Sequence, residues 1–449
     1  MEELLRNAAE RGIRYRQSVN QRRVAPLPES VQALSKLGGP LNEDPIDAEQ
    51  VLALLDETGS PATVAMAGGR YFGFVIGSSL PAATAANWLA TAWDQNACLS
   101  VMSPVAIRLE EIALGWLLDI LGLPPDTAGS FVTGATMANF TCLAAARHRV
   151  LQDVGWDVES KGLFGAPRVT VMVGAEVHPT LSKALGFLGL GRERVLTVAV
   201  DDQGRMRADE LPRISTPAIV CIQAGNVNTG AFDPAREICA YARDRGAWVH
   251  VDGAFGLWAA ASPKLAPLVA NYSEADSWAT DAHKWLNVPY DSGLAFVRDR
   301  EALRQAMSMS ASYLPLHDVR EPMDFTPDSS RRARGIEVWA ALKSLGRKGL
   351  ADLIERTCRH ATRFAEGLSA AGYTILNEVC INQVLVSFGD SQKTLRVIDA
   401  IQRDGTCWCG STVWQGQTAM RISVSSWLTT EADVERSLEA MLRIAASET

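Results

Sequence analysis

The sequence predicts an α/β protein in which a mostly parallel sheet is covered by helices on both faces. Two observations carry this prediction. Between residues 130 and 297, short apolar runs that lack strict alternation are separated by helical runs, which is typical of strands buried on both faces. The chain of 449 residues is also long enough for one large domain with smaller ones beside it. We expect a helical segment at 1–79, the large domain at 80–335 and a small α+β domain at 336–449.

The individual elements follow from apolar periodicity and from the positions of proline and glycine. The first 60 residues are predicted to be amphipathic helices, broken at Pro26, Pro28 and Pro40. Five apolar runs are predicted to be buried strands: 168–173, 194–198, 218–223, 248–251 and 294–297. Helices are predicted before these strands at 82–93 and 104–121, and within the strand-containing region at 140–149, 179–188 and 234–245. Beyond residue 335 the pattern predicts helices at 335–345, 350–371 and 431–446, and strands at 383–388 and 420–424.

Composition argues against several classes of function. The formal net charge of −8 and the pI near 5.4 do not favour nucleic acid as a partner, because phosphate binding needs a basic face. No apolar run is long enough to suggest a membrane span. The six histidines form neither HxxxH nor HExxH, so a metal site is not expected. The eight cysteines lack CxxC spacing and Met1–Glu10 does not resemble a signal peptide, so we expect a reducing cytoplasm.

Two turns at predicted strand ends have the character of ligand sites. Thr133-Gly134-Ala135-Thr136 leads into the helix at 140–149, and a small turn at a helix N-terminus presents free N–H groups to a phosphate. His178 follows the strand at 168–173 and precedes a helix that begins with Pro179, where it could stack on a planar ligand. Taken singly, the first turn could equally be a helix cap and the histidine a capping or surface residue.

Two further strand ends carry an acid and a lysine. Asp252 ends the strand at 248–251, where an acid is costly to bury unless it meets a cation, and Ala254 leaves room for a flat ring. Lys284, in the stretch TDAHKWLNVPYDSG, is one of only eight lysines among 43 basic residues. It therefore does not belong to a basic patch, and a single amine in that place suggests a chemical role.

Together these four features match the needs of one cofactor, pyridoxal 5′-phosphate. It has a phosphate to seat, a flat ring to stack, a ring nitrogen to keep protonated and an aldehyde to hold as an imine. Only a primary amine forms that imine, which is the part that Lys284 can play. The alternative is that the four turns have no shared function and that their resemblance to such a site is a coincidence.

The motifs TGATMAN, EVHPTLSKALGFLGLG, HVDGAFG and DAHKWLNVPYDSG, in this order, resemble those of the pyridoxal-phosphate-dependent group II amino-acid decarboxylases. The resemblance begins near residue 69 and extends through the stretch at 331–334. It implies fold type I, the aspartate-aminotransferase-like fold, with a mostly parallel seven-stranded sheet in the large domain. It also implies a homodimer whose active site is shared between the subunits.

The resemblance assigns expected roles to residues of this chain. Lys284 corresponds to the imine-forming lysine, and Asp252 to the acid at the pyridine nitrogen. His178 corresponds to the histidine stacked on the ring, and Ala254 to the small residue packed under it. The phosphate is expected to contact Ala135, Thr136 and His283. Asn226 takes the place of the first threonine in the stretch that lies near the cofactor's hydroxyl.

The reaction type is indicated by the segment 307–331, which is predicted to be a long loop that covers the site. Its Tyr313 resembles the mobile-loop tyrosine that protonates the substrate carbon in aromatic amino-acid decarboxylases. Because aldehyde-forming relatives usually carry phenylalanine there, Tyr313 favours plain decarboxylation, with an aromatic L-amino acid as the first candidate substrate. The alternatives are an oxidative, aldehyde-forming decarboxylase, an aminotransferase that would use Arg421, a carbon–carbon lyase, and a cofactor-binding protein without activity.

Overall fold

The computed structural model describes residues 1–309 and 320–448 and falls into two compact units. The large unit comprises Ser79–Arg359 and Asn377–Gln383. The small unit comprises Met1–Ser78, His360–Leu376 and Val384–Thr449. The division expected from the sequence, into 1–79, 80–335 and 336–449, stays a prediction.

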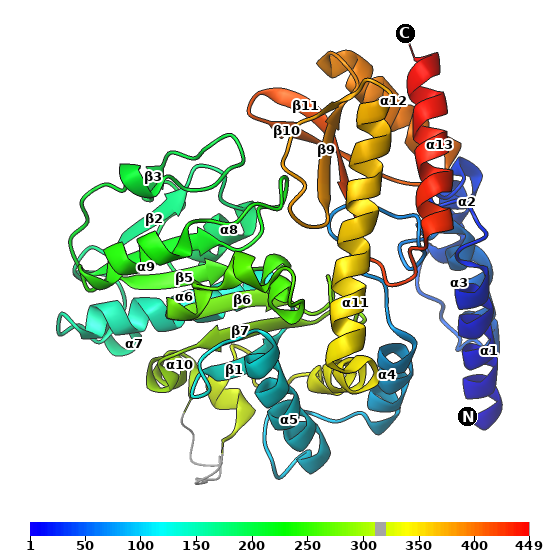
Figure 1. Ribbon diagram of the computed structural model, residues 1–449. Coiled ribbons are helices and arrows are strands. Elements are labelled where there is room, and N and C mark those ends of the chain that lie inside the picture. Colours follow the sequence, from blue (N-terminus) through cyan, green and yellow to red (C-terminus); the bar gives the residue numbers. More distant parts are fainter. Residues whose placement is uncertain (310–319, 449) are drawn as a thin grey trace. The chain divides into compact units, whose positions relative to one another are not determined.

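The large unit is built on a sheet with the strand order β1-β7-β6-β5-β4-β2-β3 (Figure 1). Its strands are β1 (Ala128–Val132), β2 (Thr170–Gly174), β3 (Leu196–Val198), β4 (Ala218–Gln223), β5 (Trp248–Asp252), β6 (Ser277–Asp281) and β7 (Gly293–Val297). Only β7 runs antiparallel to its neighbours, β1 and β6, within this sheet of described residues. The α/β fold with a mostly parallel seven-stranded sheet is thus confirmed.

Helices of the large unit pack on this sheet and bring the site together. Helix α6 (Ala135–Gln152) contacts β4 to β7 and carries the turn predicted to seat a phosphate. Helix α8 (Pro179–Phe187) packs beside α6, as does α10 (Arg300–Met307), and α9 (Ala235–Arg243) contacts β5. The other α-helices that lie wholly within this unit are α4 (Pro81–Trp93), α5 (Pro104–Ile120) and α7 (Val158–Lys161). Short 3₁₀ helices are η2 (Ala208–Glu210), η3 (Gly256–Ala261), η4 (Ala266–Val269), η5 (Tyr272–Glu274) and η6 (Pro322–Phe325).

The stretch α11 (Gly335–Ala370) consists of two helical segments that meet at Gly346. The sequence predicts two helices here, at 335–345 and 350–371. The structure confirms the interruption between them, because the φ of 59° and ψ of −178° at Gly346 are not helical. Glycine adopts a positive φ without the steric cost that a side chain would bring, so the interruption falls at this residue.

The small unit holds a four-stranded sheet of order β10-β11-β9-β8, among described residues, and a set of helices. Its strands are β8 (Thr374–Ile375), β9 (Gln383–Ser387), β10 (Gly410–Trp414) and β11 (Gln417–Ser423). Its helices are α1 (Glu2–Ser18), α2 (Pro28–Ala33), η1 (Leu34–Leu37), α3 (Ala48–Ala62), α12 (Ser391–Asp404) and α13 (Glu431–Ser447). In the part of the chain that is described, none of the helices has the length and apolar character needed to cross a bilayer.

Candidate active site

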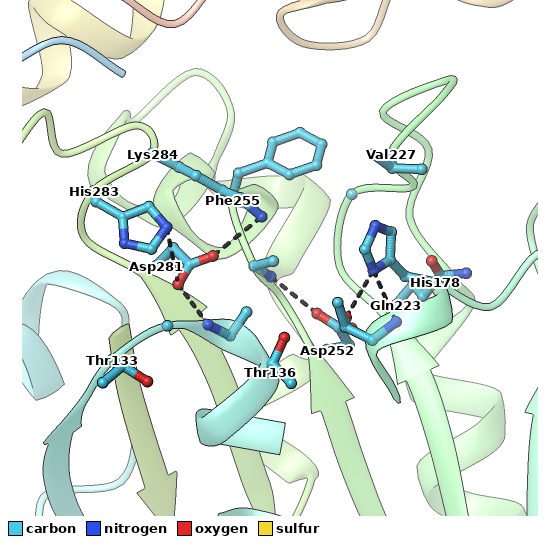
Figure 2. A pocket seen from close by; sticks show the side chains of 15 residues that line it. Thr133, Thr136, His178, Gln223, Val227, Asp252, Phe255, Asp281, His283 and Lys284 are labelled. Carbon is cyan, nitrogen blue, oxygen red and sulfur yellow. Dashed lines mark hydrogen bonds and ion pairs between the residues drawn. The ribbon is translucent and has the colours of Figure 1, made fainter. Parts of the chain in front are cut away.

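A cavity of about 310 Å³ lies at the carboxyl ends of β4, β5 and β6 and at the start of α6 (Figure 2). Ligands bind at this edge of an open α/β sheet. The predicted site residues that line the cavity are Ala135, Thr136, His178, Asp252, Ala254, His283 and Lys284. Figure 2 shows Lys284, His283 and Asp281 on one side of the cavity, with Asp252 and His178 on the other.

An ion pair holds the amine of Lys284 in the cavity. Its Nζ lies 3.1 Å from Oδ2 of Asp281, the last residue of β6. The other oxygen of Asp281 accepts the N–H of Ala135 at 2.6 Å, so the same carboxylate also binds the first turn of α6. Asp281 was not predicted to be a site residue, although an acid three residues before the lysine, at the end of a buried strand, is a usable signal.

His283 lies beside this pair and is held in one orientation. Its Nδ1 accepts the N–H of Ser292 at 3.1 Å, and its ring stacks on Tyr290 with 4.3 Å between centroids. Burial lowers the pKa of His283 below its usual value, which favours the neutral ring with the proton on Nε2. That Nε2 is 3.6 Å from Asp281 Oδ1. An N–H donor therefore lies close to the start of α6.

The turn before α6 is pressed closely against β7. A Cβ on Gly293 would lie 2.4 Å from Cα of Gly134, and a Cβ on Gly134 would lie 3.2 Å from Cε1 of His283. Only glycine at position 293 leaves room for this backbone contact. The close packing places the N-terminus of α6, with its N–H groups and the positive end of the helix dipole, at the cavity.

Asp252 is a buried carboxylate held by hydrogen-bond donors on both oxygens. Its Oδ1 accepts the N–H of Ala254 at 3.2 Å, and its Oδ2 accepts Nδ2 of Asn139 at 3.1 Å. The carboxylate is 5% exposed and lines the cavity. Asn139, on α6, was not predicted from sequence, because its contact depends on packing between a helix and a strand far apart in the chain.

His178 forms the N-cap of α8 on the Asp252 side of the cavity. Its Nδ1 accepts hydrogen bonds from the hydroxyl of Thr180 at 2.7 Å and from the N–H of Thr180 at 3.3 Å. An Nδ1 that accepts an N–H carries no proton of its own, so the proton of a neutral His178 is on Nε2. The helix cap thereby fixes the ring plane of a residue that lines the cavity.

Three residues considered from the sequence lie elsewhere or are not described. Asn226 is buried with its Oδ1 accepting the N–H groups of Asn228 and Thr229, while its neighbours Gly225 and Val227 line the cavity. A contact of Asn226 with the cofactor therefore stays a prediction that this hydrogen bonding does not favour. Tyr313 lies outside the described residues. Arg421 lies on β11 in the small unit, where burial lowers its pKa.

The conserved domain of pyridoxal-dependent decarboxylases matches residues 51–389 of the chain. The chain belongs to this family. The expectation drawn from the four sequence motifs is thus confirmed for the family and for the fold.

Named relatives within the pyridoxal-dependent decarboxylases differ in the substrate that their names indicate. The chain is 31% identical over 292 residues to the acidic amino acid decarboxylase GADL1 of Bos taurus, which covers 62% of this chain and 55% of that protein. It is 26% identical over 368 residues to the aromatic-L-amino-acid decarboxylase of Bacillus atrophaeus, covering 78% of this chain and 74% of that one. The matches to GADL1 proteins span only about half of their length.

Solved structures give the same fold. The crystal structure of Oryza sativa TDC with PLP and tryptamine superimposes with a TM-score of 0.92 at 21% identity, over 99% of this chain and 97% of that one. At this identity the likeness shows the fold alone.

The residues of the cavity fit pyridoxal phosphate, the cofactor of the family. The N-terminus of α6 and the Nε2–H of His283 suit an anion, with the N–H of Ala135 itself bonded to Asp281. The buried carboxylate of Asp252 suits a protonated ring nitrogen. Lys284 supplies a primary amine within the same cavity.

Proposed function

We propose that the protein removes the α-carboxylate of an L-amino acid, with pyridoxal phosphate as cofactor, and releases the amine and carbon dioxide. The observation that carries the proposal is one cavity with a lysine amine on one side and a buried carboxylate on the other, in a chain of the decarboxylase family. When bound, the cofactor supplies an aldehyde that condenses with amines and a ring that accepts the electron pair left when carbon dioxide departs.

The residues of the chain are proposed to divide the work as follows. Lys284 would hold the cofactor through its primary amine. The carboxylate of Asp252 would face the ring nitrogen and favour its protonated form, so that the ring can take up the charge that develops during the reaction. His178 and Ala254 would lie against the ring. The phosphate is bound by Ala135, Thr136 and His283 at the start of α6.

One proton must reach the substrate carbon after carbon dioxide leaves. We propose Tyr313 as its donor, or a water held by His178, whose neutral form carries its proton on Nε2. A phenol that protonates the carbon gives the amine rather than an aldehyde.

An aromatic side chain remains our first candidate for the substrate. Phe255 and Val227 give the cavity two apolar side chains, and no arginine is found among the described residues that line it. An acidic side chain would call for such a cationic partner. The names of the relatives include acidic and aromatic substrates, so identity alone does not choose between them.

The test is to supply purified protein and pyridoxal phosphate with a panel of L-amino acids, and to measure carbon dioxide, amine, aldehyde and peroxide together. Amine and carbon dioxide in equal amounts are expected, with the highest kcat/KM for an aromatic substrate. Aldehyde with peroxide would replace the proposal by an oxidative decarboxylation. An absence of carbon dioxide from every amino acid, alongside the absorption band of the lysine-bound cofactor, would reject the reaction while retaining the cofactor.

We also propose a homodimer and a cytoplasmic location. The dimer is the expectation carried by the family resemblance. The location is supported by the state of the cysteines, which are all free thiols in the described chain, as in a reducing compartment.

A further inference from the structure

A chain of buried side chains leads from the core to Asp252. Trp248, His250 and Asp252 alternate along β5 and so project from the same face of the strand. Trp248 Nε1 lies 2.9 Å from Oγ of Ser277, and Nδ1 of His250 lies 2.9 Å from the same oxygen. Nε2 of His250 lies 2.8 Å from Oδ1 of Asn139, whose Nδ2 is the donor to Asp252.

The carboxylate of Asp252 fixes the direction of the hydrogen bonds that lead to it. A carboxylate accepts, so the N–H₂ of Asn139 faces Asp252 and the Oδ1 of Asn139 accepts the Nε2–H of His250. A neutral ring with its proton on Nε2 has a bare Nδ1, which accepts the hydroxyl proton of Ser277. The hydroxyl oxygen of Ser277 in turn accepts from the indole of Trp248, which can only donate.

The other tautomer of His250, or a reversed amide of Asn139, would break this series of hydrogen bonds. A proton on Nδ1 of His250 would face the hydroxyl of Ser277 and leave Nε2 without a proton to give to Asn139. A reversed amide would point an oxygen at the carboxylate and an N–H₂ at Nε2–H. His250, Asn139 and Ser277 are each 0% exposed, so water cannot repair a broken bond. Burial also lowers the pKa of His250 to about 4, which agrees with a neutral ring.

We propose that His250 is a positioning residue, which acts through Asn139 to hold the Asp252 carboxylate in one orientation toward the ring nitrogen of the cofactor. The inference rests on the role proposed for Asp252. Asn139 links His250 to the carboxylate, because a hydrogen bond from Nε2–H to the amide oxygen holds the amide in the orientation that turns its N–H₂ toward Asp252.

A matched pair of variants isolates the bond to Asn139. In His250→Gln the side-chain amide can reach the place of Nε2 and still donate to Asn139. In His250→Asn the shorter amide reaches the place of Nδ1, so it can meet Ser277 but not Asn139. Cys142→Ala is the control for lost core packing: Cys142 lies one turn further along α6, is 0% exposed and bonds only backbone oxygens of Trp278 and Phe296.

The experiment compares the dissociation constants of two cofactors from each variant, by equilibrium dialysis of the reconstituted enzyme. The first is pyridoxal phosphate and the second is its carbocyclic analogue, in which a ring CH replaces the nitrogen. We expect His250→Asn to bind pyridoxal phosphate about tenfold more weakly, as supporting residues commonly do when removed, and the analogue within about twofold of the wild type. His250→Gln should stay within about threefold for both, and Cys142→Ala should not distinguish them.

Equal weakening of both cofactors by His250→Asn, or no weakening of either, would overturn the inference. Asp252→Asn separates this failure from a failure of the proposed function. If Asp252→Asn weakens pyridoxal phosphate selectively while His250→Asn does not, the role of Asp252 stands and that of His250 falls. If Asp252→Asn weakens both cofactors equally, Asp252 does not meet the ring nitrogen.

A second measurement reads the proton position in the wild-type protein. In the holoenzyme labelled with ¹⁵N-histidine, the nitrogen shifts of His250 should show a neutral ring with the proton on Nε2 at pH 5.5. The signal is assigned by its loss in His250→Gln. A cationic ring, or a proton on Nδ1, would contradict the hydrogen-bond direction on which the inference depends.

Discussion

Lys284 projects from a loop, and a carboxylate rather than the loop backbone holds its amine in the cavity. The lysine side chain is 19% exposed and that of Asp281 is 3% exposed, so their ion pair is largely shielded from water. A free lysine side chain carries about 2 kcal/mol of rotamer entropy, which this pair removes before the cofactor arrives. Because Asp281 also binds the N–H of Ala135, the amine and the anion seat are fixed relative to each other by a single residue.

Removal of the amine tests the assignment of Lys284. We expect Lys284→Ala to lower kcat by roughly a thousandfold or more, because no other primary amine lines the cavity among the described residues. The absorption band of the lysine-bound cofactor should vanish with it. The control is Lys264→Ala, a lysine whose side chain is 74% exposed and pairs with Glu355. Full activity in Lys284→Ala, measured by carbon dioxide release, would refute the mechanism.

The buried His250 predicts how stability depends on pH. An unfolded histidine titrates near 6.5, whereas burial lowers the pKa of His250 to about 4 in the folded protein. Between these values the unfolded state binds the extra proton, so the contribution of His250 to the free energy of unfolding decreases as the pH falls from about 6.5 to about 4. The full loss is on the order of 3 kcal/mol.

His250→Gln should lack this part of the pH dependence. The measurement is urea unfolding of the wild type and of the variant at several values between pH 7 and pH 5, where the wild type should lose more stability than His250→Gln. Parallel curves for the two proteins would show that His250 does not titrate as its burial indicates.

At the scale of elements, the contact between β7 and the turn before α6 decides where the anion seat lies. Gly293 begins β7, and its backbone meets Gly134 without a side chain between them. We expect Gly293→Ala to destabilise the protein by about 1–3 kcal/mol, the cost of overpacking a core. It should also weaken the binding of pyridoxal phosphate, because the turn must move away from β7.

Gly115 offers the control for this substitution. It lies within α5 and a Cβ there would meet no atom within 4 Å, so Gly115→Ala should be neutral or stabilising by up to about 1 kcal/mol. Thermal unfolding and cofactor affinity, measured for both variants, check the pair. A Gly293→Ala protein as stable as Gly115→Ala would mean that the turn tolerates a side chain.

The elements also show what could be predicted from the sequence and why. The buried strands β2, β4 and β5 are rich in valine, isoleucine and other large apolar residues, and the pattern located them within a few residues. The strands β1 (AGSFV) and β6 (SWATD) were not predicted, because small and polar residues make up more than half of each. Packing between elements, which no local pattern encodes, makes them strands buried along their whole length.

At the scale of the whole molecule, the site also contains residues that the sequence could predict and residues that it could not. Residues that follow strands, such as His178, Asp252 and Lys284, could be placed together because strand ends meet at one edge of a parallel sheet. Asn139 and His250 could not be placed at the site from the sequence. Asn139 lies on α6, 113 residues before Asp252 in the chain, and it meets Asp252 and His250 only because that helix packs on the sheet. Asp281 lay within a recognised motif, but only the structure shows its two partners.

Exposed apolar side chains on α4 support the proposed dimer. Leu89 and Trp93 are 55% and 43% exposed and lie four residues apart on one face of the helix, with Trp88 beside them at 44%. Val101, Met102 and Val105 form a second exposed group at the start of α5. Exposed apolar groups of this kind mark interaction surfaces. We therefore expect α4 to lie in the interface between two copies of the chain.

A charge on this face should separate the copies. We expect Leu89→Glu to raise the dimer dissociation constant by at least about tenfold, because a carboxylate would be desolvated in the interface. Carbon dioxide release should fall with the dimer if the active site is shared. The control is Phe164→Glu, at a 97% exposed apolar residue outside α4 and α5. Light scattering over a range of concentrations gives the mass of each variant. A Leu89→Glu protein that dimerises like Phe164→Glu would place the interface elsewhere, and a wild-type monomer with full activity would show that one chain completes the site.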